Sequence, residues 1–389
     1  MRASLRLTVE RLAPTGEGVA HESGKVVFVD GALPGETIEA EIFEEKARHA
    51  RASTAGVLEA SPDRRPADAH AASCGGTDWA HVEVEAARRF KRELFLETMA
   101  RLGGIAAHEF GELPISSSPL EYRLRNQFHA SAGEAGFFAR RSHRVVPIDG
   151  CEIVSRETRG KIRRLAAEAE GTGGTIETLE TVETGARHRL VWRAEGLRLL
   201  ASDAALDVDV GGRPFCVSAG SFFQVNRHRI APFFEQIREL AAEVAPRAAL
   251  DAYAGAGFLT HALVEAGARV TAVESDPSSA ADAAFNRARF GAERRIDLRT
   301  ESVEAFLRGP AEPADVVVAD PPRGGLRAAA AALSELARRR LIYVSCEPAS
   351  LARDLKPLLA GGLTIERAWL EDFFPLTHRV EAVVSLGRP

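Results

Sequence analysis

Four cysteines are far too few to hold a chain of 389 residues together with disulfides. Disulfide-stapled secreted modules, which depend on dense cysteine pairs, are therefore excluded. The chain also has no run of about 18 uncharged apolar residues, the length that a membrane-spanning helix needs, and we expect no contact with a membrane. Its first nine residues alternate charged and apolar side chains, unlike the apolar core of an export signal. We expect a soluble cytoplasmic protein with reduced thiols.

Lysine is scarce as well. Only five of the 50 basic residues are lysines, so 45 are arginines, which bind phosphate bidentately and stack on bases better than lysine does. A GC-rich coding sequence is the simpler explanation of this bias. The net charge of −5 argues against a nucleic-acid partner for the chain as a whole, but a binding face is local.

Sequence patterns divide the chain into three parts, at 1–58, 59–215 and 216–389. In the first part, short alternating runs lie between turns rich in glycine and proline, which predicts a small antiparallel β-barrel. The middle part begins with a linker at 59–76, and helical spacing of apolar residues predicts a helix from His81 to Leu102. The rest of it is β-rich, with predicted strands at Arg125–Ala130, His188–Trp192 and Leu206–Val210 and a helix at Arg159–Ala169.

After residue 245, apolar strands alternate with amphipathic helices, the pattern of a doubly wound, Rossmann-like α/β sheet. Strands are predicted at Ala248–Tyr253, Ala268–Glu274, Asp297–Arg299, Asp315–Asp320, Leu341–Cys346, Ile365–Leu370 and Val380–Leu386. Ligands of such sheets bind outside the carboxyl ends of the strands, so the residues that follow each strand are candidates for a site.

The first two strand ends predict an adenosine cofactor. The first is followed by Gly255 and Gly257, but Thr260 stands where the dinucleotide-binding fingerprint has its third glycine. The second ends in Glu274, where a carboxylate can accept both hydroxyls of a ribose. A glycine turn with a ribose-binding acid, but without the pyrophosphate fingerprint, favours S-adenosylmethionine. The alternative is an ordinary tight turn with a solvated carboxylate.

Two later strand ends point to the chemistry. Asp320-Pro321-Pro322-Arg323 has arginine where amine methyltransferases tend to have an aromatic residue, so amine methylation is disfavoured. Cys346 ends the fifth strand beside the expected cofactor, where a nucleophile would be useful, whereas Cys216 fits a small buried side chain.

Methylation of uracil at C5 explains such a thiol. C5 is too weak a nucleophile to take a methyl group unaided. Addition of a thiolate to C6 turns the ring into an enolate, and C5 of this enolate can attack the methyl group. A base must then remove the C5 proton. Glu381 is the candidate base, and a structural carboxylate paired with Arg379 is the alternative interpretation. His378 is the competing base, with an ordinary pKa of about 6.5 against about 4.3 for glutamate.

Five motifs, in this order and spacing, resemble those of the bacterial RNA uracil-C5 methyltransferases: Ser221–Asn226, Asp251–Phe258, Asp320–Arg323, Ser345–Asp354 and Thr377–Glu381. The resemblance covers the whole chain. Residues 1–58 resemble the small RNA-binding barrel called the TRAM domain, and Tyr122–Asn126 with Gly136–His143 resembles the family's central domain.

The resemblance implies a role for individual residues. Cys346 would attack C6, Glu381 would remove the C5 proton, and Asp320 would lie between cofactor and base. Phe222 would stack on the target uracil. The residues implied at the cofactor site are Gln224, Tyr253, Glu274 and Asp320.

The chain departs from the family pattern where relatives with the barrel often hold a [4Fe–4S] cluster on four cysteines. The corresponding residues here are Asp68, Cys74, Thr77 and Cys151. A threonine hydroxyl is a poor substitute for a thiolate ligand of iron. We therefore predict that the protein holds neither an iron–sulfur cluster nor another metal.

The expected partner is RNA. Residues 121–165 hold ten basic against five acidic side chains, with aromatic residues between them, which is typical of an RNA-binding surface, although a solvated charged face is the alternative. The candidate RNA ligands are Arg123, Arg125, Arg140 and Arg141. Ribosomal RNA is favoured over transfer RNA because relatives with the barrel commonly act there, and a monomer is expected. The alternative functions are an RNA-binding protein of this fold without turnover and a methyltransferase for a small molecule.

Overall fold

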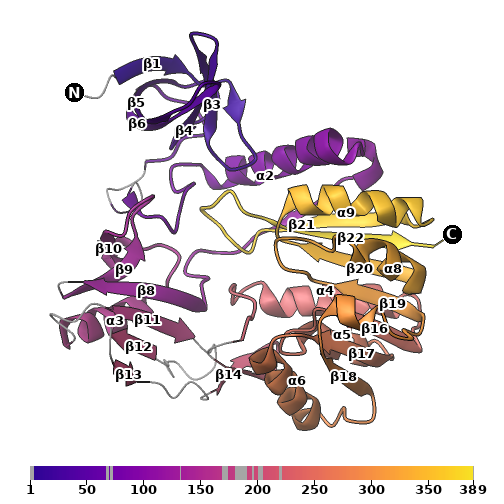
Figure 1. The fold of residues 1–389 in the computed structure, drawn as a ribbon. Helices are drawn as coiled ribbons and strands as arrows, with labels where there is room; N and C mark the ends of the chain where they lie inside the picture. The colour runs from indigo at the N-terminus through magenta and orange to yellow at the C-terminus, as the bar shows by residue number, and fades with distance from the viewer. Residues whose placement is uncertain are drawn as a thin grey trace.

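The structure is a computed structural model of the chain, which describes residues 4–66, 70, 73–131, 133–168, 174–179, 191–194, 197–199, 205–218 and 221–388. Figure 1 shows a barrel at the top, a central sheet at the left and a large sheet with helices on both faces at the right. In the described part of the chain, no helix has the length and apolar character needed to cross a membrane.

The N-terminal part is a coiled six-stranded sheet in the order β1-β5-β6-β4-β3-β2 (Figure 1). Its strands are β1 (Ser4–Thr8), β2 (Arg11–Leu12), β3 (Gly18–Glu22), β4 (Lys25–Asp30), β5 (Thr37–Glu45) and β6 (His49–Glu59). Alternate side chains such as Val27 and Val29 are buried inside it, as the sequence pattern predicts. The prediction of wholly antiparallel pairing is wrong for one pair, because β4 and β6 run parallel. Alternation shows which face of a strand is buried but not which neighbour it pairs with.

Helix α2 (Val84–Thr98) lies between the barrel and the large sheet (Figure 1). It continues as a π-helical turn at Met99–Gly103 and ends at Gly104, whose φ of +69° belongs to the left-handed region. Phe90 packs with barrel residue Leu12 and with Trp79, while Phe95 packs into the core of the large sheet. The predicted helix is confirmed; it begins three residues after the predicted start at His81, and with its π-helical turn it extends to Gly103, next to the predicted end at Leu102.

The central part is a six-stranded sheet in the order β10-β9-β8-β11-β12-β13. Its strands are β8 (Arg125–Ser131), β9 (Glu134–Phe138), β10 (Val145–Pro147), β11 (Gly174–Leu179), β12 (Val191–Ala194) and β13 (Leu197–Leu199). Helix α3 (Arg156–Glu168) follows β10 and packs on β9. Of the strand predicted at His188–Trp192, residues 188–190 lie outside the described part. A separate hairpin, β14 (Ala205–Asp209) with β15 (Pro214–Ser218), packs through Val208 and Val217 on the core of the large sheet.

The large sheet confirms the predicted doubly wound α/β fold. Its order is β18-β17-β16-β19-β20-β22-β21-β7. The strands are β7 (Ile115–Ser116), β16 (Ala248–Ala252), β17 (Arg269–Glu274), β18 (Ile296–Thr300), β19 (Ala314–Ala319), β20 (Ala337–Ser345), β21 (Thr364–Glu371) and β22 (Glu381–Gly387). The helices are α4 (Ile230–Ala242), α5 (Phe258–Glu265), α6 (Pro277–Arg289), α7 (Val303–Phe306), α8 (Ala329–Leu336) and α9 (Pro348–Ala360).

The topology of this sheet positions the site. The five neighbouring strands β18, β17, β16, β19 and β20 are parallel. The chain builds this sheet outward in opposite directions from β16 and β19, so a ligand crevice is expected outside the carboxyl ends of these two strands. Strand β22 comes after β21 in the chain but lies between β20 and β21, antiparallel to both. Successive residues of β19, such as Val317 and Val318, enter the cores on opposite faces of the sheet.

Candidate active site

Cys346 and Glu381 meet at the end of two paired strands. The final register pair of β20 and β22 is Ser345 opposite Ala382, so the next positions along the two strands are Cys346 and Glu381. Cys346 is partly exposed, whereas Glu381 is buried. The pairing thus brings together a thiol and a carboxyl group that lie 35 residues apart in the sequence.

A third acid, Asp320, directly follows the neighbouring strand β19. Burial, and then the charge of Asp251, raises the pKa of Asp320 to about 7. Burial, and then the charge of Asp320, holds the pKa of Glu381 well above the usual value. Burial, with the charges of Glu381 and Asp320, raises the pKa of the Cys346 thiol to about 12. Burial and neighbouring negative charges therefore make it unfavourable for Cys346, Glu381 and Asp320 to be ionised at the same time, and the site favours their protonated forms.

Arg323 partly offsets this effect. Its guanidinium lowers the pKa of both Glu381 and Cys346, but burial and the carboxylates outweigh it. Among the residues that the structure describes, Glu381 forms no ion pair with Arg379, which was the alternative interpretation of this carboxylate. Its Oε2 atom is buried and has no hydrogen-bond partner among these residues. A buried carboxyl oxygen without a hydrogen-bond partner is costly, so its presence at Glu381 needs an explanation.

The glycine turn after β16 has an open side. Tyr253, Gly255 and Gly257 all have φ in the left-handed region, at +73°, +56° and +86°. A Cβ atom added at Gly255 would meet no atom within 4 Å. The Glu274 carboxylate accepts hydrogen bonds from the backbone N–H groups of Gly255, at 2.8 Å, and of Asp276, at 2.7 Å, so it fixes the turn to the end of β17.

These residues fit S-adenosylmethionine. The open face of the turn lets a ligand approach the backbone closely, and the Glu274 carboxylate retains lone pairs for ribose hydroxyls. Gln224 is buried and donates its amide N–H to Asp320 Oδ2 at 3.5 Å, which joins the 221–226 segment to the end of β19. Burial raises the pKa of Tyr253 to about 12, so its phenol is neutral. Phe222, by contrast, is 62% exposed, unusually so for a phenylalanine.

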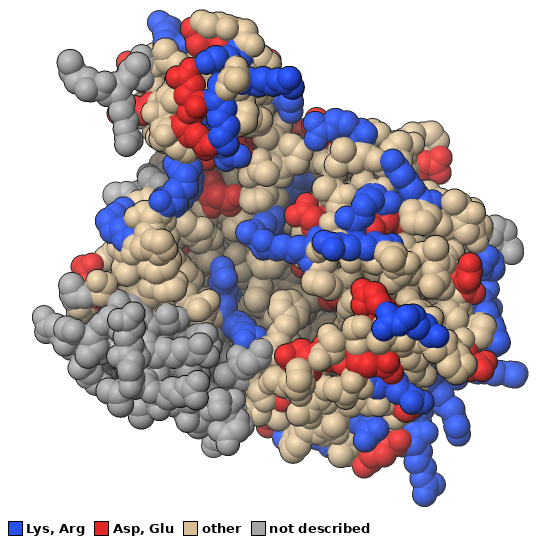
Figure 2. Space-filling model, viewed as in Figure 1, with Lys and Arg blue, Asp and Glu red and all other residues tan. Residues whose placement is uncertain are grey.

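A cleft of about 670 Å³ lies where the barrel, the central part and the large sheet meet. Figure 2 shows arginine and lysine side chains gathered along the hollow between these parts. In the cleft, Phe138 stacks on His129 with ring centroids 3.5 Å apart. The cleft contains five arginines and two aspartates among its lining residues: Asp30, Asp78, Arg123, Arg140, Arg141, Arg323 and Arg379. It is therefore basic and aromatic, and Arg323, which influences the pKa of Cys346 and Glu381, belongs to its lining.

The four arginines predicted as RNA ligands have different surroundings. Arg123 lies over the ring of Phe137, 5.4 Å from its centroid, in the cleft. Arg140 is tied to the 74–77 backbone, and donates to the Thr77 carbonyl at 2.8 Å. Arg141 forms an ion pair with barrel residue Asp30.

Arg125 is not among the residues that line the cleft, and its guanidinium donates a hydrogen bond to the Ser221 carbonyl. Exposed Arg323 and Arg379 line the cleft, and the described ion pairs and hydrogen bonds involve neither of their guanidinium groups. Arg379 was not among the candidate RNA ligands predicted from the sequence, although it lies inside the Thr377–Glu381 motif.

His378, the competing base, pairs with Asp78. Its Nδ1 atom is hydrogen-bonded to the Asp78 carboxylate, and its backbone N–H donates to Asp78 Oδ1 at 3.2 Å. The ring lies edge-on to Trp79, with centroids 6.4 Å apart. His378 therefore has structural partners in the 78–79 turn, whereas Glu381 faces the thiol.

Cys74 and Cys151 lie in the core of the central part, together with Tyr122 and Phe128. Burial raises the pKa of Cys74, and it raises that of Cys151 to about 11, so both are neutral thiols. Thr77 is buried next to Cys74, and Asp68 lies outside the described residues. Cys216 is buried and pairs through its backbone with the Asn286 amide, which confirms its predicted role as a small core residue.

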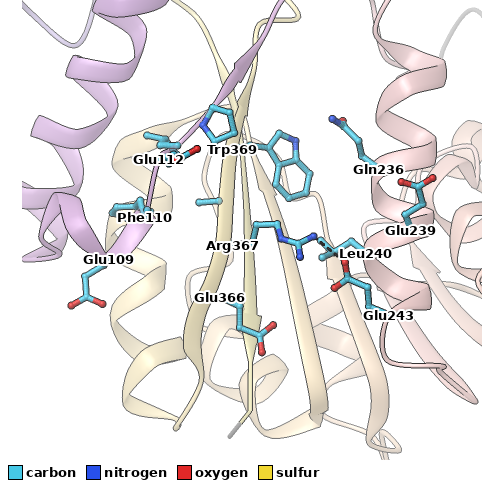
Figure 3. Close-up of a pocket in the computed structure, with 14 residues that line it drawn as sticks. Glu109, Phe110, Glu112, Gln236, Glu239, Leu240, Glu243, Glu366, Arg367 and Trp369 are labelled. Carbon is cyan, nitrogen blue, oxygen red and sulfur yellow. Dashed lines mark hydrogen bonds and ion pairs between the residues drawn. The ribbon is translucent and has the colours of Figure 1, made fainter.

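A second cavity, of about 470 Å³, is shown in Figure 3. It is bordered by α4, by β21 and by the segment before β7, and Trp369 lies within it. Arg367 donates to Glu243 Oε1 at 2.9 Å, and Glu366 pairs with Arg340. The described lining is acidic and contains none of the site residues predicted from the sequence.

The fold and site define a class. A doubly wound sheet with an open glycine turn, an acid after its second strand and polar residues at the switch point is a Rossmann-like methyltransferase domain. The model of the tRNA (uracil-5-)-methyltransferase family matches residues 312–389, and that of the TRAM domain matches residues 2–54.

Similar proteins extend these matches to the whole chain. The 23S rRNA (uracil(1939)-C(5))-methyltransferase RlmD of Chromohalobacter salexigens is 33% identical, over 98% of this chain and 89% of that protein. An uncharacterized RNA methyltransferase of Streptomyces avermitilis is also 33% identical, over 96% of each chain. The crystal structure of the Pyrococcus abyssi tRNA (uracil-54, C5)-methyltransferase with S-adenosyl-L-homocysteine has a TM-score of 0.75, over 98% of this chain and 100% of that one; at 21% identity it shows a common fold. The chain belongs to the family of RNA uracil-C5 methyltransferases and is an S-adenosylmethionine-dependent enzyme.

Proposed function

We propose that the protein methylates C5 of one uridine in structured RNA, with Cys346 as nucleophile and Glu381 as base. The observation that carries this proposal is the pairing of Ser345 with Ala382, which brings the adjoining residues Cys346 and Glu381 together, close enough to Asp320 for both carboxyl groups to raise the pKa of the thiol. No other described thiol has this setting, since the remaining three are buried in packed cores.

The reaction would run in three steps. The Cys346 thiolate adds to C6 of uracil, which forms a C6–S bond and moves the ring electron pair toward C5 and O4. C5 then takes up the electrophilic methyl group that bound S-adenosylmethionine would supply, and the electron pair of the broken S–CH3 bond stays on the cofactor sulfur, which gives S-adenosylhomocysteine. Glu381 then removes the C5 proton, and the electron pair it leaves restores the C5–C6 double bond and expels the thiolate.

The cofactor would bind in the crevice between β16 and β19. Gly255 lets it approach the turn, Glu274 accepts the ribose hydroxyls, and Tyr253, Gln224 and Asp320 complete the site. Phe222 would stack on the uracil once the nucleotide has flipped out of its helix.

Ribosomal RNA is the favoured substrate. The Chromohalobacter relative and one from Shewanella piezotolerans, 30% identical over 100% of this chain, are named as 23S rRNA enzymes. The Pyrococcus structure is that of a tRNA enzyme, so transfer RNA is the second candidate. The cleft residues Arg123, Arg323 and Arg379 would bind the phosphates of either RNA.

The protein is also proposed to work without an iron–sulfur cluster. Thr77 provides a hydroxyl where a thiolate is needed, and Cys74 and Cys151 are neutral thiols in an apolar core. Protein purified without air is expected to contain no stoichiometric iron and no visible absorbance band. Iron in stoichiometric amount would overturn this proposal.

The nucleophile is tested with RNA that carries 5-fluorouridine at the target. Fluorine at C5 cannot leave as a proton, so the adduct with the wild-type protein should persist on a denaturing gel. Cys346→Ala should form none, while Cys216→Ala, a matched change at a thiol outside the site, should form it as the wild type does. An adduct with Cys346→Ala would refute the assignment.

A further inference from the structure

The segment between β21 and β22, residues 372–380, leads directly into Glu381 and is held by distant parts of the chain. Four of its consecutive carbonyl groups, from Phe373 to Leu376, each accept a hydrogen bond from a residue far away in the sequence. These donors are Asn226 Nδ2 (3.1 Å), Lys91 Nζ (3.2 Å), the Tyr122 hydroxyl (3.1 Å) and the Trp79 backbone N–H (2.9 Å), in that order. None of these donors belongs to β21 or β22, so the path of the segment is set from outside.

Leu376 shows that this path is held against a local preference. Its φ of +63° lies in the left-handed region, which costs a residue with a Cβ atom about 1 kcal/mol or more. Its side chain is buried in the core of the central part, with Tyr122 and Phe128. A leucine keeps such a conformation only where its surroundings over-determine it.

The end of the segment is joined to the barrel. Asp78 accepts hydrogen bonds from both the ring and the backbone N–H of His378. Trp79 donates its indole N–H to the carbonyl of barrel residue Gly16 at 2.9 Å. A Cβ atom on Gly16 would come within 2.7 Å of the His378 Cβ, so the barrel turn and His378 are in close contact.

The Glu381 side chain has few constraints of its own. The Oε2 atom lacks a hydrogen-bond partner among the described residues, and the carboxyl group lies only three residues after His378. Its direction toward the ring of a bound uracil therefore depends on where the preceding backbone enters β22.

We propose that Asp78 and His378 are positioning residues for Glu381, and that the barrel with the 78–79 turn forms a brace that aims this base. This inference rests on the proposed role of Glu381. The brace acts on proton removal from C5, because it holds the segment that enters Glu381, whereas Cys346 is held by β20 and by the start of α9.

The test separates the first chemical step from the last. Adduct formation with 5-fluorouridine RNA needs Cys346 but no removal of a C5 proton. Asp78→Asn and His378→Leu should therefore form this adduct at the wild-type rate. On uridine RNA the same variants should lose about tenfold to a hundredfold in kcat, with KM for the RNA within about twofold, because a small displacement of a reacting group has an effect of that size.

A conservative variant and a control sharpen the result. His378→Asn keeps a donor close to the place of Nδ1 and should recover most of the kcat that His378→Leu loses. His21→Leu removes a comparable pair with Glu10 inside the barrel, where the His21–Glu10 distance is 2.9 Å, and should change nothing.

The outcomes are decisive for each proposal separately. If the wild type forms no 5-fluorouridine adduct, the proposed function fails. If the wild type does, the brace is refuted by unchanged kcat in Asp78→Asn, by an effect confined to KM, by adduct formation that is lost along with turnover, or by His378→Asn behaving as His378→Leu does.

Discussion

Three acidic side chains, Cys346, Glu381 and Asp320, lie where burial and neighbouring negative charges raise the pKa of each. With a pKa of about 12, the Cys346 thiol is neutral in the free protein, and Asp320 is about half ionised near neutral pH. The main positive influence on the thiol is Arg323, which is exposed to the cleft. With the thiol protonated, the site suits the uncharged ring of a uracil. If Cys346 is the nucleophile, its thiol must lose its proton after the RNA has bound.

Replacement of the base should separate methylation from release. In Glu381→Gln the thiol can still add to C6 and C5 can still be methylated, but the C5 proton has no acceptor. We expect turnover to fall about 10²- to 10⁴-fold, and protein linked to uridine RNA should accumulate on a denaturing gel. Normal turnover of this variant would transfer the role of base to His378.

The pH dependence of turnover should reflect the raised pKa values. Glu381 must be ionised to act, and burial and Asp320 hold its pKa above the usual value, so activity should be lost on acidification at a higher pH than for an ordinary glutamate, about 4.3. Asp320→Asn removes a neighbouring negative charge and should move this acid limb to lower pH. Arg323→Gln removes a positive charge and should move it to higher pH. Single-turnover rates across the pH range measure both shifts; equal midpoints in all three proteins would contradict the assignment.

At the scale of elements, α2 stabilises the segment before the base. Lys91 of α2 is fully buried, and its Nζ atom lies 2.6 Å from Asp372 Oδ1, which follows β21. Ser117 and the Phe374 backbone N–H also donate to the Asp372 carboxylate. A helical residue 281 positions before Asp372 in the chain is in this way part of the support of the site.

Loss of one partner of this pair should be costly. Lys91→Met leaves the Asp372 carboxylate buried without its cation, and we expect the free energy of unfolding to fall by about 3–5 kcal/mol. Lys91→Met with Asp372→Leu removes both charges and should recover most of that loss. Urea unfolding of the two variants measures the difference; equal destabilisation would show that the pair contributes no coupling.

Most elements could be predicted from local pattern, but their partners could not. The α/β alternation after residue 245 predicted every main strand of the large sheet within a few residues. Strand β20 begins at Ala337, four residues before the predicted start. The three arginines at 338–340 do not look like a buried strand in the sequence, but Arg340 is buried and paired with Glu243 and Glu366. The two residues of β7 are too short to show any period. The pairing of β20 with β22, which creates the site, is a long-range choice that no local pattern contains.

The same limit holds for the site residues. Cys346, Asp320 and Glu381 lie in motifs at strand ends, so sequence and resemblance pointed to them. Asp78 and Lys91 lie in no motif, and their importance comes only from contacts made across the molecule. Arg140 and Arg141, predicted as RNA ligands from a basic run, both line the cleft; the protein groups to which they also bind could not be predicted from the sequence.

At the scale of the whole molecule, the basic cleft joins three parts that are distant in sequence (Figure 2). Its lining comes from the barrel, from the central sheet and from the segments around Arg323 and Arg379. A structured RNA laid in this cleft would contact all three parts at once, which suits recognition of a folded RNA rather than of a short single strand. The net charge of −5 is thus compatible with RNA binding, because the acidic groups gather elsewhere, as around the cavity of Figure 3.

The salt dependence of RNA binding should show whether Arg379 in the cleft contacts a phosphate. If Arg379 binds a phosphate, Arg379→Ala should weaken RNA binding and lower the slope of log K against log salt by about 1. Arg299→Ala, at an exposed arginine of β18 that pairs with Asp297, is the matched control and should leave the slope unchanged. Equal slopes for Arg379→Ala and the wild type would remove Arg379 from the RNA interface.

The insertion of β22 between β20 and β21 has a consequence for protein synthesis. A ribosome produces Cys346 and the cofactor turn before it produces Glu381, and β22 must then enter a gap between two strands that are already made. A nascent chain that ends before β22 has a thiol but no base, so any uridine it attacked would stay attached to it. Because β22 brings Glu381 to the end of β20, the site is complete only after this last strand has paired.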